Sequence, residues 1–178
     1  MTTQVLIAGF GGQGVLFAGK FLAYKGLLED KQVSWLPSYG PEMRGGTANC
    51  SIIISDEPVG SPIVSNPDVL LAMNLPSLDK YESEAVPGSV IIVDSTLIDR
   101  KLTRTDVKAF YIPATRLAKE MNAPTLANMI MIGKMIKESN AVSIDNLEDA
   151  MKKVVPAKKA DLMGINMQAV MLGYNYND

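Results

Sequence analysis

The sequence predicts an α/β fold, a three-layer domain around a mostly parallel, mixed sheet, with an attached antiparallel hairpin and helices gathered at the C-terminus. Two observations lead to this prediction. Up to residue 112, short apolar runs alternate with helical stretches, and beyond it the pattern is helical throughout. A chain of 178 residues with 47% hydrophobic residues is also long enough to bury the core of one domain. We therefore expect a single domain over residues 1–178.

The N-terminal part predicts a strand, a tight loop and a helix. Residues 4–8 form a short apolar run that ends at Gly9, and good helix formers occupy 15–28. A second strand is expected at 33–36, where Pro37 should end it before a loop.

The middle part predicts a hairpin and then a return to alternating strands and helices. Residues 47–55 and 59–65 are β-prone runs around 56–58, so we expect them to pair as the antiparallel hairpin. Further strands are expected at 68–73, 89–93 and 108–112, with a helix that begins near Pro76 and is closed by Pro87-Gly88. The C-terminal helices are expected at 114–122, 125–138, 144–155 and 158–172.

Charge and hydropathy exclude two classes of partner. The net charge is −2, and no run of Lys or Arg is longer than a pair such as Lys158-Lys159, which disfavours a nucleic-acid role. The N-terminus lacks a basic region before its apolar segment, and no apolar stretch reaches the length of a membrane span. We expect no membrane partner and a cytoplasmic location.

Two gaps in the composition restrict the chemistry. The chain has no histidine and a single cysteine, Cys50. A Ser-His-Asp triad, a Cys-His pair, a zinc site with nitrogen ligands and a cysteine-ligated iron–sulfur cluster each need residues that this chain lacks. If the protein takes part in redox chemistry, another chain carries the electrons.

A glycine loop follows the first predicted strand and has the spacing G-x-G-x-x-G. Such a loop can bind an anion through backbone N–H groups at the start of a helix. The residues proposed for an anion contact are Gly9, Gly11, Gly12, Gln13 and Gly14. An NAD site would also need an acidic residue near the end of the second strand, where residues 35–38 offer none. The alternative, that the glycines only permit a tight turn and close packing, remains open.

A second glycine pattern falls one residue short of a P-loop. Phe21 stands where the Ser or Thr after Gly19-Lys20 would be required. Apolar helix formers surround this pair, so we expect it in the middle of a helix, and nucleotide hydrolysis is disfavoured.

A second loop, residues 38–46, is rich in glycine and carries fixed charge. Arg44 offers a planar cation for a carboxylate or phosphate, and Glu42 could pair with it or with a partner chain. A solvated connector with a weak surface ion pair is the alternative. The proposed interface or ligand loop comprises Ser38, Tyr39, Gly40, Pro41, Glu42, Met43, Arg44, Gly45 and Gly46.

Several other side chains have a structural interpretation. Cys50 is expected to be inert and to face the core, and Asp94 is expected to cap a following segment rather than bind a ligand. Two groups of methionines on predicted helices should pack in the core or at a subunit interface: Met129, Met131 and Met135, and Met163, Met167 and Met171.

The two loops together resemble the gamma subunit, or gamma domain, of the 2-oxoacid:ferredoxin oxidoreductases. The resemblance rests on Gly-Phe-Gly-Gly-Gln-Gly at 9–14 and on Ser-Tyr-Gly-Pro-Glu-Met-Arg-Gly-Gly-Thr-Ala-Asn-Cys-Ser at 38–51. It covers most of the first half of the chain and continues through Ser61-Pro62, Asn66-Pro67-Asp68, Asn74 and Asp79-Lys80-Tyr81. The segment Pro-Glu-Met-Arg-Gly-Gly resembles the 2-oxoglutarate and branched-chain 2-oxoacid members of the family more closely than the pyruvate members.

The resemblance implies a subunit of a complex rather than an enzyme active alone. In such complexes thiamine diphosphate with Mg attacks the 2-oxo carbon, CO2 leaves, electrons pass through 4Fe-4S clusters to ferredoxin, and the acyl group goes to coenzyme A. The implied partners are alpha, beta and ferredoxin-like delta subunits, which would hold the cofactors and clusters, so this chain alone would hold no cofactor or metal. The alternatives are an autonomous Rossmann-like nucleotide-binding module and a purely structural interaction subunit.

Overall fold

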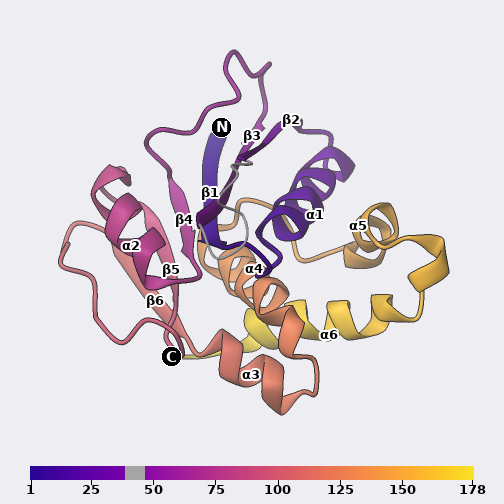
Figure 1. The fold of residues 1–178 in the computed structure, drawn as a ribbon. Helices are drawn as coiled ribbons and strands as arrows, with labels where there is room; N and C mark the ends of the chain where they lie inside the picture. The colour runs from indigo at the N-terminus through magenta and orange to yellow at the C-terminus, as the bar shows by residue number, and fades with distance from the viewer. Residues whose placement is uncertain (39–46) are drawn as a thin grey trace.

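The computed structural model describes residues 1–38 and 47–178, and a mixed six-stranded sheet lies at its centre (Figure 1). The strand order across the sheet is β2-β3-β1-β4-β5-β6. The strands are β1 (Thr2–Phe10), β2 (Gln32–Ser38), β3 (Thr47–Ser55), β4 (Val69–Ala72), β5 (Val90–Asp94) and β6 (Lys108–Ile112). β1, β4, β5 and β6 are mutually parallel, whereas β2 and β3 run antiparallel to their neighbours.

Six α-helices accompany this sheet in the part of the chain that the structure describes. They are α1 (Val15–Leu28), α2 (Leu75–Tyr81), α3 (Ala114–Glu120), α4 (Ala127–Ser139), α5 (Leu147–Val154) and α6 (Leu162–Asn175). Short 3-10 turns lie at η1 (Glu82–Glu84), η2 (Pro124–Leu126) and η3 (Ala157–Lys159). Among the residues described, no helix combines the length and the apolar character that crossing a membrane would need.

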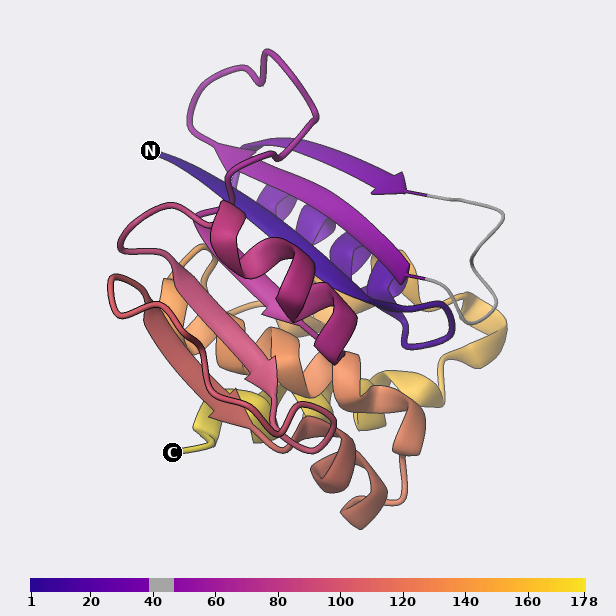
Figure 2. The same ribbon diagram turned by 60° about the vertical axis from the view of Figure 1, so that its left-hand side comes forward.

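Helices cover both faces of the sheet, which makes it the middle of three layers. Along β1, Val5 and Ile7 belong to one apolar core, and Leu6 and Ala8 belong to the other, because successive side chains of a strand point to opposite faces. Figures 1 and 2 show α2 on one face and α1 and α4 on the other, with α6 outside α4. The predicted fold class is therefore confirmed.

The predicted hairpin between 47–55 and 59–65 is wrong. Residues 59–65 form no strand, and β3 pairs instead with β2 on one side and β1 on the other. Both edges of β3 are therefore occupied. Pro58 and Pro62 also remove backbone donors from the segment that was expected to pair. The antiparallel hairpin is formed by β2 and β3.

Pro37 does not end the second strand, contrary to expectation. β2 continues to Ser38, and Pro37 lies opposite Cys50 of β3. Because β2 is the outermost strand of the sheet, it needs ladder hydrogen bonds on one side only. A proline is tolerated in such a strand, and the edge position explains why the proline does not act as a stop here.

The C-terminal helices pack through unusually close backbones. A Cβ placed on Gly133 of α4 would overlap the carbonyl oxygen of Val170, and one placed on Gly173 of α6 would overlap the carbonyl oxygen of Ile130. These two glycines therefore let α4 and α6 approach more closely than any other residue would allow. The methionines of α4, namely Met129, Met131 and Met135, are fully buried in the same core, as expected.

Candidate functional site

The candidate site lies at the topological switch point of the sheet, between the parallel strands β1 and β4. After β1 the chain enters α1, which covers one face and leads towards the β2 edge, whereas after β4 it enters α2, which covers the other face and leads to β5. Two adjacent parallel strands whose connections leave to opposite sides open a crevice beyond their carboxyl ends. The glycine loop after β1 and residues Met73-Asn74 after β4 occupy this place.

The glycine loop forms a tight turn that begins α1. Gly14 is the N-cap of α1 with φ 73°, and Gly12 has φ 93°, both in the left-handed region that side chains disfavour. The placement of Gly14 at the helix start is as the spacing indicates. Gly11 is not among the positive-φ glycines of the described residues, so the conformational requirement for glycine falls on Gly12 and Gly14.

Gln13 braces the loop rather than extending from it. Its Oε1 accepts a hydrogen bond from the backbone N–H of Phe10 at 2.6 Å, and its Nε2 donates to the carbonyl of Met73 at 3.1 Å. Its backbone N–H donates to the carbonyl of Phe10 at 3.2 Å. The side chain thus ties the ends of β1 and β4 together, and a ligand contact at this loop would fall to the glycines.

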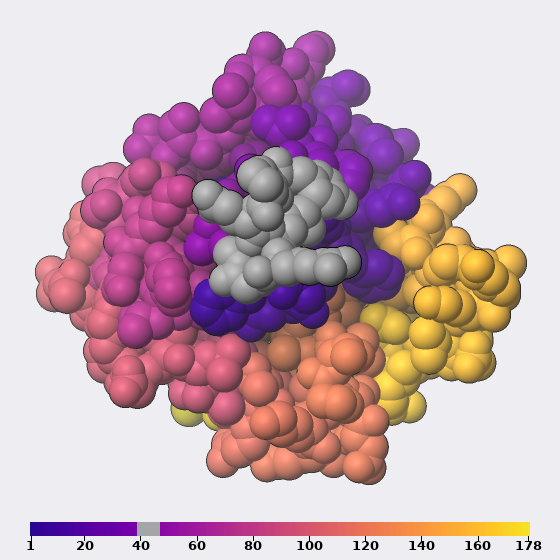
Figure 3. All heavy atoms as spheres, viewed as in Figure 1, coloured from indigo at the N-terminus to yellow at the C-terminus, as the bar shows by residue number. Residues whose placement is uncertain are grey.

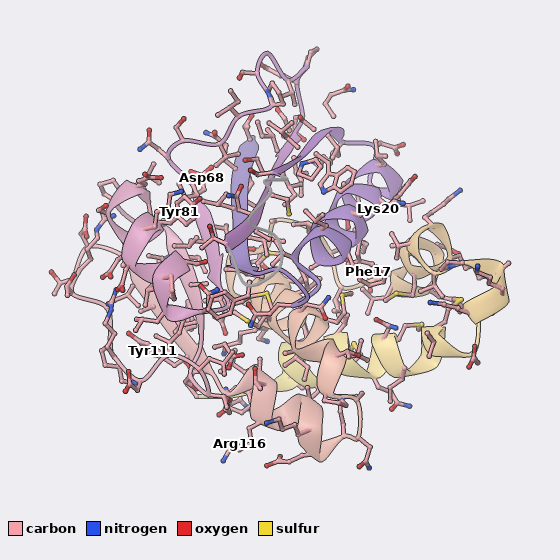
Figure 4. The ribbon with its side chains drawn as sticks, viewed as in Figure 1. Phe17, Lys20, Asp68, Tyr81, Tyr111 and Arg116 are labelled. Atoms are coloured by element: carbon pink, nitrogen blue, oxygen red, sulfur yellow. The ribbon has the colours of Figure 1, made fainter. Side chains whose placement is uncertain are left out.

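A cavity of about 440 Å³ adjoins the loop. Its wall includes Gly12 and Gly14 from the loop and Phe17 from α1, which Figure 4 labels on the side of α1 towards α5 and α6. The rest of the wall comes from the C-terminal helices and their connections: Thr125, Leu126, Asn128, Val154, Val155, Pro156, Lys159, Leu162 and Asn166. The lining is largely apolar, with two amides, one hydroxyl and one cation, a composition common in small-molecule sites.

The ends of the second loop meet the same edge of the sheet. Thr47 lies opposite Phe10, and Ser38 lies opposite Asn49, so both residues sit near the carboxyl end of β1. The proposed loop residues from Tyr39 to Gly46, Arg44 among them, lie outside the described residues. In the space-filling view of Figure 3, the indigo N-terminal part of the chain reaches the surface above the orange atoms of α3 and α4. The two segments that the sequence distinguishes thus start from one region of the sheet.

The structure does not support a dinucleotide site. In a Rossmann unit the strand after α1 lies parallel beside β1 and ends in an acidic residue that binds the ribose. Here β2 does not lie beside β1, because β3 is inserted between them, and the parallel neighbour β4 is followed by Met73-Asn74, which carries no acidic residue. The P-loop interpretation also fails, because Gly19-Lys20 lies within α1, as expected.

Two other polar side chains have the structural roles expected of them. Cys50 is fully buried, and burial raises the pKa of its thiol to about 12. Asp94 is also fully buried, and its carboxylate accepts hydrogen bonds from the backbone N–H of Thr96 at 3.1 Å and from the hydroxyl of Thr115, in the first turn of α3, at 2.6 Å. No cluster of three or more His, Cys, Asp or Glu side chains suited to a metal ion occurs within residues 1–38 and 47–178.

Comparison with known proteins identifies the family. Residues 4–176 match the family described as "Pyruvate ferredoxin/flavodoxin oxidoreductase". The chain is 38% identical over 159 residues to the 2-oxoglutarate synthase subunit KorC of Methanocaldococcus jannaschii, an alignment that covers 88% of this chain and 85% of that one. This chain belongs to the pyruvate ferredoxin/flavodoxin oxidoreductase family. The resemblance drawn from the two loops is therefore confirmed.

Other members of the family differ in length or confirm the fold. The ketoisovalerate oxidoreductase subunit VorA of Methanothermobacter thermautotrophicus is 38% identical over 174 residues, but this chain spans 35% of its length. The crystal structure of the keto/oxoacid ferredoxin oxidoreductase gamma subunit of Geobacter sulfurreducens matches with a TM-score of 0.81 at 30% identity and covers 97% of this chain and 96% of that one. The family fold thus accounts for nearly the whole chain.

Two features of the site were not predicted from the sequence. Asn128 and the carbonyl of Met73 both hold the glycine loop, yet neither lies near it in the sequence. For Asn128 a signal existed, since it is a polar residue inside an otherwise apolar helical stretch, but the stretch did not indicate its partner. The cavity wall from α5 and α6 left no recognisable pattern at all.

Proposed function

We propose that residues 1–178 form one domain that serves as the gamma-type subunit of a multi-subunit 2-oxoacid:ferredoxin oxidoreductase. The complex would decarboxylate a 2-oxoacid of the 2-oxoglutarate or 2-oxoisovalerate type, pass two electrons to ferredoxin and transfer the acyl group to coenzyme A. The observation that carries the proposal is the match to KorC over 85% of that subunit's length. The Geobacter gamma subunit supports it with a fold that covers 96% of its own chain.

The composition of this chain fits a division of labour among subunits. A 4Fe-4S cluster needs about four cysteine ligands, whereas this chain has Cys50 alone, fully buried and held protonated by its raised pKa. The chain also lacks the Gly-Asp-Gly…Asn-Asn signature of thiamine diphosphate sites. Clusters, thiamine diphosphate and Mg would therefore belong to alpha, beta and ferredoxin-like delta subunits, and ferredoxin would be the acceptor of the whole complex.

The glycine loop is the proposed contribution of this chain to ligand binding. A helix start with free backbone N–H groups favours the anionic groups of coenzyme A, and the adjoining cavity offers apolar wall to an uncharged portion of the molecule. The segment from Ser38 to Gly46 would contribute a subunit contact or a ligand contact through Arg44. Both proposals predict that this chain is required for the coenzyme A-dependent step.

The test is reconstitution with and without this chain. We expect the isolated chain to be colourless above the protein absorption band and to turn over no 2-oxoacid, and its addition to the remaining subunits to restore coenzyme A-dependent ferredoxin reduction. The 2-oxoacid that gives the highest kcat/KM, compared among 2-oxoglutarate, 2-oxoisovalerate and pyruvate, would identify the substrate class. Stoichiometric iron and sulfide on the isolated chain, or full activity without it, would contradict the proposal.

A further inference from the structure

Asn128 reaches from the C-terminal helices to the glycine loop. It is the second residue of α4 and is 3% exposed. Its Nδ2 donates a hydrogen bond of 3.0 Å to the carbonyl of Gly14, which lies 114 residues away in the sequence. Its Oδ1 accepts from the backbone N–H of Met129 at 2.9 Å. Both ends of the amide are therefore occupied by backbone groups, which leaves the side chain suited to holding the loop rather than to binding a ligand.

The carbonyl of Gly14 joins the loop both to Asn128 and to the first turn of α1. It also accepts the first backbone hydrogen bond of α1, from Ala18 at 3.0 Å. Gly14 itself is in the left-handed region, and a Cβ at this position would overlap the Asn128 amide. The amide thus packs directly against the residue that sets the direction of the helix start. A shift of Asn128 would therefore move the Gly14 peptide group, and Gly14 lines the cavity.

The helix that carries Asn128 is itself rigidly placed. Met129, Ile130, Met131 and Ile132, which follow it, are all fully buried. The backbone of α4 is locked against α6 through Gly133 and Gly173, and α4 also packs on β4 and β5. On the other side of the loop, Gln13 is tied to the carbonyl of Met73, directly after β4. The loop is therefore held between two fixed supports, of which Asn128 is the one from the helical layer.

We infer that Asn128 is a positioning residue that fixes the glycine loop in its ligand-binding geometry through its hydrogen bond to Gly14. The inference rests on the proposed coenzyme A contact at that loop. Asn166 lies on the same cavity wall, is 5% exposed, and its Oδ1 lacks a hydrogen-bond partner among the described residues. Because buried polar atoms normally have a partner, this oxygen supports a cavity that binds a further molecule.

The primary test replaces Asn128 in the reconstituted complex. Asn128→Ala removes the bond to Gly14 without adding charge, and we expect the KM for coenzyme A to rise about fivefold while kcat stays within about twofold, as for the loss of one buried hydrogen bond. Asn128→Asp cannot donate to the carbonyl and places a negative charge beside it, so the rise in KM should be larger. The KM for the 2-oxoacid should not change with either variant.

Asn66 provides the matched control. Its Nδ2 also donates to a backbone carbonyl, that of Glu84, at 3.0 Å, and it lies away from the loop at an exposed position. Asn66→Ala and Asn66→Asp make the same chemical changes and should leave the KM for coenzyme A unaltered. Equal effects at Asn66 and Asn128, or a fall in kcat with no change in this KM, would overturn the positioning role.

Hydrogen exchange of the full chain gives a readout that does not depend on activity. Asn128→Ala should speed exchange of the backbone amides in residues 10–18, whereas Asn66→Ala should not. If Asn128→Ala does not fold, Asn128→Ser replaces it, because serine suits the first turn of a helix but is too short to reach Gly14. Unchanged exchange at 10–18 would refute the inference. A wild-type complex without coenzyme A dependence would instead refute the proposed function, while the exchange comparison would still decide the role of Asn128.

Discussion

At the scale of single residues, an added side chain would strain the backbone at both Gly12 and Gly14, and at Gly14 it would also be overpacked. Gly12 has φ 93° and open space around a Cβ, whereas Gly14 has φ 73° and would also press its Cβ against the Asn128 amide. Gly12→Ala should lower the free energy of unfolding by about 1–2 kcal/mol through backbone strain, and Gly14→Ala by at least about 1 kcal/mol more through overpacking. Urea unfolding of the chain measures both.

Gly60 is the control for this pair. A Cβ there meets nothing within 4 Å and its φ is not in the left-handed region. Gly60→Ala should therefore change the free energy of unfolding by less than about 0.5 kcal/mol. Equal losses at Gly12 and Gly14 would show that the Asn128 amide moves aside, and no loss at Gly12 would mean that the loop is not the turn described.

Cys50 gives a prediction about pH. Burial raises its pKa from 9.0 to about 12, so the folded state keeps the proton that the unfolded state loses above pH 9. The stability that this thiol contributes is complete below pH 9 and declines as the pH rises from 9 towards 12. Cys50→Ala should show a weaker loss of stability than wild type across that range. The native thiol should also resist iodoacetamide at pH 8 and react on unfolding; rapid labelling of the native chain would contradict its burial.

At the scale of elements, the contact between α4 and α6 depends on glycine at one end of α6 and not at the other. A Cβ on Gly173 would enter the backbone of α4, whereas one on Gly164 meets nothing within 4 Å. Gly173→Ala should destabilise the chain by roughly 3 kcal/mol or more. Gly164→Ala should stabilise it by up to about 1 kcal/mol, because alanine favours the helix. Thermal unfolding of the two variants tests the contact, and similar midpoints would contradict it.

At the scale of the whole molecule, Arg44 tests whether the second loop contributes a cation to a contact within the proposed complex. If Arg44 pairs with a buried group of a ligand or partner, Arg44→Ala should cost about 2–5 kcal/mol in assembly or binding. Arg44→Lys should recover only part, because lysine lacks the bidentate fork. Native mass of the complex and the KM for coenzyme A separate the two roles. Effects below about 0.5 kcal/mol in both variants would mark Arg44 as a solvated residue.

Strand and helix positions followed from the sequence wherever a short apolar run or a stretch of helix formers was clearly bounded. The strands at 4–8, 68–73 and 89–93 were predicted because each contains a short continuous apolar run, and the helix at 15–28 because it consists of good helix formers. The pairing of β3 was not predicted correctly, because a run of β-prone residues indicates a strand but does not indicate which strand it pairs with. No sequence pattern indicated that β1, rather than residues 59–65, would occupy the second edge of β3.

The sequence by itself determined the family, the position of the glycine loop and the absence of cluster ligands, since each depends on residues that are near in the chain or simply counted. The tertiary structure alone decided what holds the loop. Gln13 to Met73 spans 60 residues and Asn128 to Gly14 spans 114, and both bonds end on backbone carbonyls. Every residue carries such a carbonyl, so side-chain identity cannot reveal which one is chosen. The pairing of β1 with β4 brings Gln13 to Met73, and the packing of α4 against the sheet brings Asn128 to Gly14.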